Sequence, residues 1–419
     1  MIRDVVQSGL CTGCGTCAGI CPKSAIEMRK DTFKGIYIPQ LNIKKCNKCG
    51  LCAKVCPGFI VDLRELNLTL FRKEPNNYSM GNFINCYVGY ATDYKIRYNS
   101  SSGGLVTSLL AFALKQGMID GALVTKMSDK NPFEASGFLA KTEQELMYAS
   151  RSKYLPVPVN IFLKKMLNEK GRFAVVGLPC HIHGIRKTQC FFENARSKIV
   201  FCFGLACRNT PTFDATEYIL WNLGIDKQDV ISINYRGCGW PGGMTITLRN
   251  SKRIFVPYKS QVYWGGALSL FFCPWRCSLC NDRVNTLADI SFMDAWLPEF
   301  SKDYVGTSLV MSRSKSADKL ILKAMEAGQI EVKKVQCNAV MQSQALEYAE
   351  RTFAARYLIV KALGKRVPFY NKGIAVPKVY DFRDSILFLL RNYHFISEKD
   401  KYWKFISFYL HFLNRRFKR

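Results

Sequence analysis

The sequence has little of what a membrane or secreted protein requires. No apolar run reaches the roughly 18 to 20 residues that span a bilayer, and the longest one, at residues 105–114, contains Thr107 and Ser108. No apolar signal segment precedes the first cysteine, Cys11. We therefore expect a cytoplasmic protein without a transmembrane helix. In that reducing compartment its 18 cysteines are expected to bind metal rather than to form disulfides.

Acidic residues are also scarce, since 32 Asp and Glu stand against 60 Lys and Arg, a formal charge of +28. Such an excess suits a nucleic-acid-binding protein, but the basic residues are dispersed and no helix-turn-helix or zinc-finger pattern occurs. The small-residue stretch at residues 100–104 is not a GxGxxG motif, and GxxxxGK(S/T) does not occur, so ordinary dinucleotide-binding and P-loop folds have no motif support. The 419 residues, 48% of them hydrophobic, provide two or three domains with cores and exclude a disordered chain.

Eight cysteines fall in two blocks of one pattern, CxxCxxCxxxCP. The blocks are CTGCGTCAGICP at residues 11–22 and CNKCGLCAKVCP at residues 46–57. Three thiolates spaced in this way wrap one iron–sulfur cube, and the fourth cysteine of each block binds the other cube. A zinc site requires two separated CxxC pairs and fits less well. We therefore predict two [4Fe–4S] clusters, one on Cys11, Cys14, Cys17 and Cys56 and the other on Cys46, Cys49, Cys52 and Cys21.

Beyond the cysteine blocks, strand-like and helix-like segments alternate. CYVGYATD (86–93) and GALVTK (121–126) have the character of strands, and the apolar spacing of Leu105–Gln116 predicts a helix between them. Residues 172–177 and 198–204 have the pattern of buried strands, each followed by a loop with polar and sulfur-containing side chains. Because open α/β sheets bind their ligands at such strand ends, we predict a mixed α/β body that carries a binding site.

A loop of small residues, Ser100–Gly104, precedes the predicted helix, and Arg97 lies just before it. Free N–H groups and the positive end of the helix dipole make such a loop suitable for an anion, such as the diphosphate of a flavin. The same residues also suit a plain N-terminal cap with a flexible turn. The sequence of the loop is compatible with both interpretations.

Further candidate site residues lie in the loops after the predicted strands and in a CxxC motif. They are Cys180, His181, His183, Cys207, Arg208, Cys277 and Cys280. The two histidines are candidates for delivering a proton to a reduced substrate. The alternative, that an HxH on a turn serves packing or hydrogen bonding, is the more common one.

Four motifs behind the cysteine blocks resemble, as an ordered set, those of the coenzyme F420 hydrogenase/dehydrogenase beta subunit family. They are SSGG, GLPCHIHGIRK, YRGCGWPGG and RCSLCNDRVNTLADISFMDAW, and the similarity covers roughly residues 1–300. Members of this family are iron–sulfur flavoproteins, so the resemblance implies an FAD between the clusters and a two-electron substrate such as coenzyme F420. It implies FAD binding at Ser101, Ser102, Gly103 and Gly104, with Lys153 and Tyr154 nearby, and we assign Arg97 to the same site.

The resemblance also suggests a third [4Fe–4S] cluster, for which Cys180, Cys207, Cys277 and Cys280 are the candidate ligands. The alternative is that Cys180 and Cys207 are small buried apolar side chains, as free cysteines often are. Most of the remaining cysteines we assign to the core: Cys86, Cys190, Cys202, Cys238, Cys273 and Cys337.

Two positions depart from the family's motifs. Cys238 stands where the glycine-rich loop usually has a lysine, and Met293 precedes Asp294 where a glycine is usual. The first change removes a positive charge that would face a flavin or an anionic substrate. Both changes therefore bear on which substrate is used rather than on the flavin or the clusters.

The expected domain plan is a dicluster ferredoxin-type domain (1–60), a linker (61–82), a flavin-binding α/β subdomain (83–150), the family's C-terminal domain (151–338) and a basic helical extension (339–419). The extension contains two predicted amphipathic helices, at 345–364 and 385–395. Its last stretch, 402–419, combines aromatic and basic residues. We expect this stretch to dock on the body, although it also suits a peripheral position on an anionic membrane.

These patterns predict an iron–sulfur flavoprotein oxidoreductase. Residues 1–60 hold nine Lys and Arg against three Asp and Glu, which favours an acidic ferredoxin or another electron-transfer protein as partner, although solvated lysines alone explain the same excess. A small-molecule two-electron substrate is the second partner, and no nucleic acid is expected. The alternative function is a subunit that only relays electrons to a separate catalytic partner.

Overall fold

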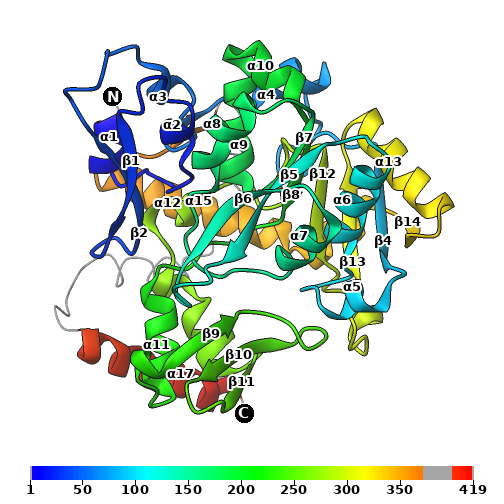
Figure 1. The fold of residues 1–419 in the computed structure, drawn as a ribbon. Helices are drawn as coiled ribbons and strands as arrows, with labels where there is room; N and C mark the ends of the chain where they lie inside the picture. The colour runs from blue at the N-terminus through cyan, green and yellow to red at the C-terminus, as the bar shows by residue number, and fades with distance from the viewer. Residues whose placement is uncertain (1, 371–398, 418–419) are drawn as a thin grey trace.

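A computed structural model describes residues 2–370 and 399–417, and its centre is an eight-stranded mixed sheet (Figure 1). The strand order is β14-β4-β13-β12-β8-β7-β5-β6. Strands β5, β7, β8 and β12 run parallel, and the strands on either side of this block pair antiparallel. In chain order the strands are β4 (Asn85–Ala91), β5 (Gly121–Met127), β6 (Ala135–Ala140), β7 (Phe173–Gly177), β8 (Ile199–Leu205), β12 (Ile290–Asp294), β13 (Ser308–Ser312) and β14 (Ile330–Val335).

Helices cover both faces of this sheet, because alternate strand residues point to opposite sides. Ala122 and Val124 of β5 pack under the first group of helices, whereas Leu123 faces the second. The first group is α6 (Leu105–Lys115), α7 (Glu143–Tyr148) and α13 (Lys315–Glu326), and the second includes α4 (Leu63–Phe71), α8 (Leu163–Asn168), α9 (Pro179–Phe191), α10 (Glu193–Lys198) and α15 (Leu346–Ala362). The mixed α/β fold expected from the sequence is therefore confirmed.

The cysteine-rich domain packs against the second group of helices (Figure 1). It contains α1 (Ile2–Gln7), α2 (Thr16–Gly19), the hairpin β1 (Ile26–Asp31) and β2 (Ile36–Leu41), and α3 (Leu51–Lys54). Two glycines allow close contact: a Cβ on Gly19 would lie 1.9 Å from the carbonyl oxygen of Asn160, and one on Gly184 would lie 2.2 Å from Oγ1 of Thr16. The domain is therefore fitted tightly to the body rather than tethered to it.

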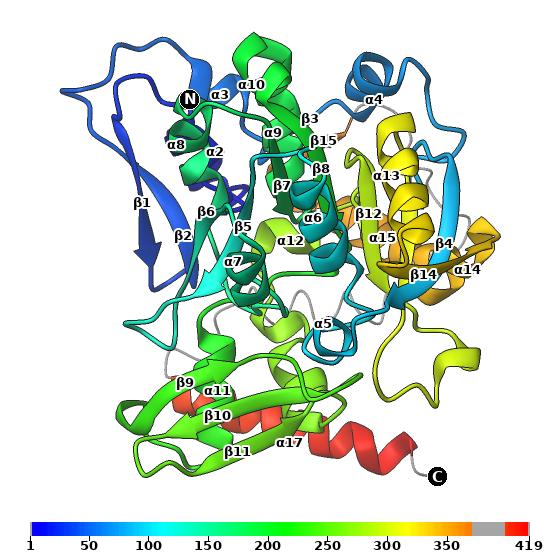
Figure 2. The same cartoon turned by 45° about the vertical axis from the view of Figure 1, so that its right-hand side comes forward.

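A separate lobe lies below the large sheet in both ribbon views (Figures 1 and 2). It is an antiparallel three-stranded sheet, β9 (Val230–Asn234), β10 (Gly243–Leu248) and β11 (Arg253–Pro257), backed by α11 (Asp214–Asn222) and the π-helix η3 (Gln261–Ala267). The last helix, α17 (Lys399–Phe417), packs on this lobe, with Trp403 8% and Ile406 0% exposed in its core. The expected docking of the C-terminal stretch is confirmed for the described residues.

The structure bears on the expected boundaries in two places. The segment 61–82, expected as a linker, contains the end of strand β3 (Ile60–Val61) and helix α4. Asp62 caps this helix by accepting a hydrogen bond from the N–H of Glu65. The segments 83–150 and 151–338 both contribute strands to the eight-stranded sheet, as two subregions of one α/β body would. Helix α15 confirms the helix expected at 345–364, whereas the helix expected at 385–395 lies outside the described residues.

The remaining elements are short connections. They are α5 (Tyr94–Tyr98), η1 (Val159–Phe162), η2 (Lys227–Asp229), η4 (Leu270–Phe272), α12 (Trp275–Ser278), η5 (Pro298–Phe300), α14 (Cys337–Ser343) and β15 (Phe369–Tyr370), which pairs parallel with β3. Among the described residues, no helix is both long and apolar enough to cross a membrane.

Candidate functional site

The eight cysteines of the front domain form two sets that exchange their last members. Burial, and then the nearby thiols of Cys56 and Cys14, raise the pKa of Cys11 to about 12. Burial also raises the pKa of Cys52, whose neighbouring thiols are Cys49, Cys21 and Cys46. Cys56 thus lies near the first block and Cys21 near the second.

The surroundings of these sulfurs fit iron–sulfur clusters. Backbone N–H groups approach the sulfur atoms: Gly13 N lies 3.4 Å from Cys11 Sγ, Ala25 N 3.3 Å from Cys21 Sγ and Gly58 N 3.4 Å from Cys56 Sγ. Such donors stabilise cluster-bound thiolates. Within residues 2–370 and 399–417, no three Cys, His, Asp or Glu side chains converge on one point as the ligands of a single ion would.

The four candidate ligands of a third cluster also come together. Burial, and then the thiols of Cys14, Cys277, Cys207 and Cys280, raise the pKa of Cys180 well above its usual value. These thiols come from the start of α9, the loop after β8 and the CxxC segment around α12. Burial raises the pKa of Cys180, Cys207 and Cys277, and binding of iron would replace the protons of these thiols. The set fits a cluster, and Cys14 places it beside the first front set.

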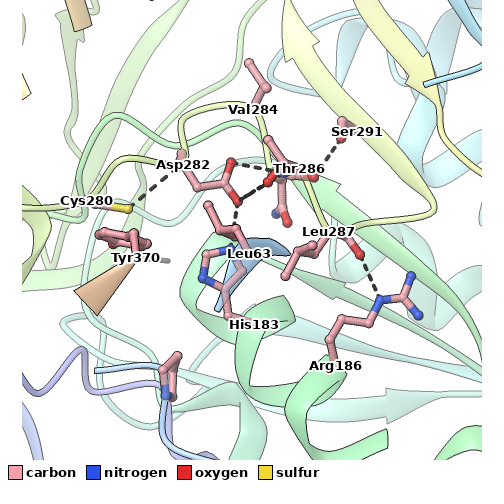
Figure 3. A network of polar contacts seen from close by, with 12 residues as sticks. Leu63, His183, Arg186, Cys280, Asp282, Val284, Thr286, Leu287, Ser291 and Tyr370 are labelled. Atoms are coloured by element: carbon pink, nitrogen blue, oxygen red, sulfur yellow. Dashed lines mark hydrogen bonds and ion pairs between the residues drawn. The ribbon is translucent and has the colours of Figure 1, made fainter. Parts of the chain in front are cut away.

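A buried polar network holds α9 against the CxxC segment (Figure 3). Nε2 of His183 lies 2.7 Å from Oδ2 of Asp282, and both side chains are at most 2% exposed. Asp282 also accepts hydrogen bonds from the N–H and hydroxyl of Thr286. On the same helix, Nε of Arg186 donates to the carbonyl oxygen of Leu287, 2.8 Å away. The network positions Cys180 relative to Cys280.

Arg276, in the CxxC segment, connects this set to the front domain. Its Nε donates to the carbonyl oxygen of Gly58 at 2.7 Å, and its Nη2 donates to Tyr370 Oη at 2.7 Å. The arginine is 3% exposed. Because Gly58 follows Cys56 by two residues, the CxxC segment and the first front set are held together directly.

The two histidines have structural partners. Nδ1 of His181 accepts a hydrogen bond from Leu178 N, and Nε2 lies 3.1 Å from the carbonyl oxygen of Val157. Burial lowers the pKa of His181 to about 4, and the hydrogen bond to Val157 opposes this effect. His183 is paired with Asp282. The packing interpretation therefore fits both side chains better than proton delivery does.

The Ser/Gly loop is fixed by neighbouring strands. Ser102 Oγ donates to the carbonyl oxygen of Thr307 at 2.7 Å, and Gly103 N donates to Ser308 Oγ at 2.9 Å. A Cβ on Gly103 would lie 2.6 Å from the carbonyl oxygen of Gly89. Packing alone therefore explains Gly103. The anion-binding interpretation keeps its support from α6, whose first N–H groups have no intrahelical acceptor and no side-chain cap.

The other residues assigned to the flavin lie near this loop but differ in orientation. Ser101 Oγ accepts from Ser152 N at 2.7 Å, which brings the loop against residues 151–154. Lys153 Nζ donates to the carbonyl oxygens of Ala149, Ser150 and Arg151 at the end of α7. Arg97 Nε donates to the carbonyl oxygen of Gly306 at 2.7 Å. Lys153 and Arg97 thus hold the protein framework of the site.

Sequence reasoning missed Arg236, which lies in the glycine-rich loop. This side chain is 2% exposed, and its Nη1 donates to Asp294 Oδ2 at 2.8 Å and to Tyr154 Oη at 3.1 Å. Among the described residues, its Nη2 has no hydrogen-bond partner, and neither does Nε1 of buried Trp240. The ring centroids of Trp240 and Trp296 are 4.6 Å apart. Aromatic rings with unpaired buried donors fit a planar ligand that carries acceptor atoms, as a flavin ring does.

A signal for this site existed in the sequence, since Arg236 and Asp294 fall within motifs noted above and Tyr154 was placed near the flavin. Their convergence depends on two strand ends and a loop that are far apart in the chain, and it was not visible in the sequence. The two residues that depart from the family's motifs lie in different environments. Cys238 is exposed, whereas Met293 is 5% exposed and packs in the core.

Three family models match the chain. The model described as "Coenzyme F420 hydrogenase/dehydrogenase, beta subunit N-term" matches residues 86–164, and the one for the C terminus of the same subunit matches residues 170–337. A 4Fe–4S dicluster domain matches residues 10–60. The two beta subunit models together cover more than half of the chain.

Several curated proteins are similar in sequence. The coenzyme F420 hydrogenase subunit beta of Methanothermobacter thermautotrophicus is 28% identical over 69% of this chain and 99% of its own length. The coenzyme F420-dependent sulfite reductase of Methanocaldococcus jannaschii is 24% identical over 76% of this chain and 46% of its own length.

Among solved structures, a chain of the F420-reducing NiFe hydrogenase complex from Methanosarcina barkeri superposes with a TM-score of 0.53. It is 22% identical, and the match covers 73% of this chain and all of that one. This likeness concerns the fold. The family models show that the chain belongs to the coenzyme F420 hydrogenase/dehydrogenase beta subunit family and carries an N-terminal 4Fe–4S dicluster domain.

Proposed function

We propose that the protein is an iron–sulfur flavoprotein oxidoreductase that transfers electrons between a one-electron carrier and a two-electron organic substrate. The observation that carries this proposal is the continuity of the three cysteine sets. The second front set neighbours the first through Cys52 and Cys17, and the first neighbours the third through Cys14 and Cys180. Clusters on these thiolates would form an unbroken path from the surface into the α/β body.

FAD is proposed for the region between the Ser/Gly loop and the glycine-rich loop. The uncapped start of α6 would hold an anionic part of the cofactor. Arg236 Nη2 and Trp240 Nε1 would donate to acceptor atoms of its ring. When bound, FAD supplies the exchange between single electrons and electron pairs. Ser101, Ser102, Gly104 and Tyr154 would contribute to the site, with Arg97 and Lys153 as its support.

The proposed electron carrier is an acidic ferredoxin or a similar protein that docks at the second front set. Cys49 is exposed and Cys46 and Cys52 are half-buried, so this set lies at the surface. Lys44, Lys45 and Lys48 are exposed around it. Complementary charge would guide an acidic carrier to this face.

Coenzyme F420 is the first candidate for the two-electron substrate, because several relatives carry that name. Cys238, where a lysine is usual, favours testing other electron acceptors beside it. The experiment is to purify the protein anaerobically and determine iron, sulfide and flavin per chain, then assay reduction of F420 and of an artificial two-electron acceptor. We expect about twelve irons, four for each of three cubes, and one FAD.

A matched pair of variants tests the third cluster. Cys180→Ser is expected to lose about four irons per chain, whereas Cys190→Ser, a half-buried cysteine on the same helix outside the set, should keep the full complement. About eight irons in the unmodified protein, or the same content in both variants, would contradict the third cluster.

The alternative function is electron relay to a separate catalytic subunit. The same anaerobic preparation separates the two functions. Iron without flavin, together with no reduction of either acceptor by the isolated chain, would favour the relay.

A further inference from the structure

A buried chain of hydrogen bonds runs from the first front cysteine set to the start of α9, and it has no role in the function proposed above. It consists of the sulfur of Cys14, the hydroxyl of Thr16 and the side-chain amide of Asn160. Thr16 Oγ1 lies 3.2 Å from Cys14 Sγ, and Asn160 Nδ2 lies 2.8 Å from Thr16 Oγ1. Thr16 and Asn160 are both 0% exposed, so bulk water does not compete for these contacts.

The orientation of the Asn160 amide is fixed by a second contact. Nδ2 lies 2.9 Å from the carbonyl oxygen of His181, a group that only accepts hydrogen bonds. The amide nitrogen must therefore occupy this position, because two oxygen atoms at that distance would repel each other. Nδ2 carries two hydrogens, so one bonds to His181 and the other to Thr16. The backbone N–H of Asn160 donates to the carbonyl oxygen of Cys14 at 3.0 Å, so this residue joins the loop of Cys14 to the start of α9.

This orientation decides which atom the Thr16 hydroxyl binds. Because Thr16 Oγ1 accepts a hydrogen from Asn160, its own single hydrogen is free for Cys14 Sγ. A metal-bound thiolate carries no proton, so the hydroxyl is the donor once Cys14 binds iron. Helix α9 restricts the hydroxyl from the other side, since a Cβ on Gly184 would lie 2.2 Å from Thr16 Oγ1. The hydroxyl is therefore held against the sulfur by groups of η1 and α9.

We propose that the Thr16 hydroxyl, oriented by Asn160, raises the reduction potential of the [4Fe–4S] cluster that Cys14 binds. The one-electron carrier adds one negative charge to the cluster and its thiolates, and the hydroxyl keeps its proton. A hydrogen bond donated to a thiolate stabilises that added charge, and it does so more strongly in a buried site than in water. Thr16 and Asn160 are positioning residues, since they act through Cys14. The inference rests on the proposed function, in which this cluster lies on the electron path.

The test is a redox titration of the anaerobically purified protein, followed by electron paramagnetic resonance. Thr16→Val removes the hydroxyl and keeps a branched side chain. One cluster reduction step should move to lower potential, with at least a threefold change in the ratio of reduced to oxidised cluster, about 28 mV for one electron. Thr16→Ser keeps the hydroxyl and should leave every step in place. Thr12→Val makes the same exchange at a half-buried threonine of the same loop and should also change no step.

Two further variants complete the series. Asn160→Ala keeps the hydroxyl but lets it turn away from the sulfur, so the same step should move in the same direction by a smaller factor. An unchanged step in this variant would overturn the role of Asn160. Thr16→Ala places no methyl group against Gly184 and is the second test of the hydroxyl if Thr16→Val folds poorly. Iron is determined on the same samples.

The competing explanation is that Thr16 and Asn160 only hold the front domain against the body. It predicts earlier unfolding of Thr16→Val in urea with unchanged potentials, and unchanged potentials would overturn the proposal. A step that moves to higher potential, an equal shift in Thr12→Val, or a loss of about four irons per chain in both Thr16→Val and Thr16→Ala would overturn it as well. A preparation with iron but without flavin would defeat the proposed oxidoreductase function, whereas its cluster potentials would still decide this proposal.

Discussion

Lys153 places an amine inside the protein at the end of α7. Burial, and then the charge of Arg151, lower the pKa of Lys153 to about 7, whereas a lysine in the unfolded chain titrates near ~10.4. Between these values the unfolded chain binds more protons than the folded protein, so the free energy of unfolding rises with pH. The slope from this one group approaches ~1.4 kcal/mol per pH unit.

Urea unfolding at pH 7, 8 and 9 checks this effect by comparing the unmodified protein with Lys153→Met. The variant should lack this part of the slope, and Lys130→Met, at an exposed lysine, should keep it. Identical slopes in all three proteins would mean that the three carbonyl groups around Lys153 keep its ammonium protonated.

The carboxylate of Asp282 is a second buried charged group, and His183 is its partner. His183→Ala would leave the carboxylate of Asp282 buried with Thr286 alone, which costs about 3–5 kcal/mol of unfolding free energy. His183→Gln retains a hydrogen-bonding side chain and should cost less, and His411→Ala, exposed on α17, serves as the control. We also expect lower iron content in His183→Ala, because the pair aligns Cys180 with Cys280. A free energy equal to that of the His411→Ala protein would refute this role.

At the scale of the element, helix α17 shows how an aromatic and basic segment packs against the rest of the protein. Ile406 is fully buried in the lobe core, near Tyr218 and Phe272, whereas Phe408 on the same helix is 71% exposed. Ile406→Ala should lower the free energy of unfolding by about 2–5 kcal/mol, and Phe408→Ala should change it by no more than ~0.5 kcal/mol. Chemical denaturation measures both, and equal small effects would show that the helix does not dock on the lobe.

Local patterns predicted the elements that depend on local signals. Helix α6 begins at Leu105 and ends at Lys115, as its apolar spacing and Gly117 indicate, and β7 and β8 occupy the predicted buried strands. Helix α4 was missed because its mixed polar composition resembles a linker, although the cap formed by Asp62 and Glu65 was visible in the sequence. The lobe of β9–β11 was not predicted as a unit, since its core includes α17 from the distant end of the chain.

The same division holds for the candidate site. The spacing of the front cysteines is enough to predict which of them would share a cluster, because one short motif turns three sulfurs to one cube. The grouping of Arg236 with Asp294 and Tyr154 depends on the ends of β9 and β12 and on the loop after α7, and it could not be predicted from local sequence. Cys180, Cys207, Cys277 and Cys280 lie between these cases, since four sulfur ligands were expected and only the fold brings them together.

For the whole molecule, the position of charge relative to the exposed cysteine set governs how a carrier docks. Lys44→Glu/Lys45→Glu/Lys48→Glu reverses charge beside this set, whereas Lys315→Glu/Lys319→Glu/Lys323→Glu makes the same change in net charge on exposed residues of α13. Both ribbon views place α13 on the opposite side of the molecule (Figures 1 and 2).

Stopped-flow reduction of the iron–sulfur absorbance by a reduced acidic ferredoxin should slow at least tenfold at low salt, and only in the variant with Lys44, Lys45 and Lys48 replaced. The difference should shrink as salt shortens the screening length from about 10 Å at 0.1 M to about 3 Å at 1 M. An equal loss in both triple variants would show that net charge, rather than this face, attracts the carrier, and the iron content of each protein controls for cluster loss.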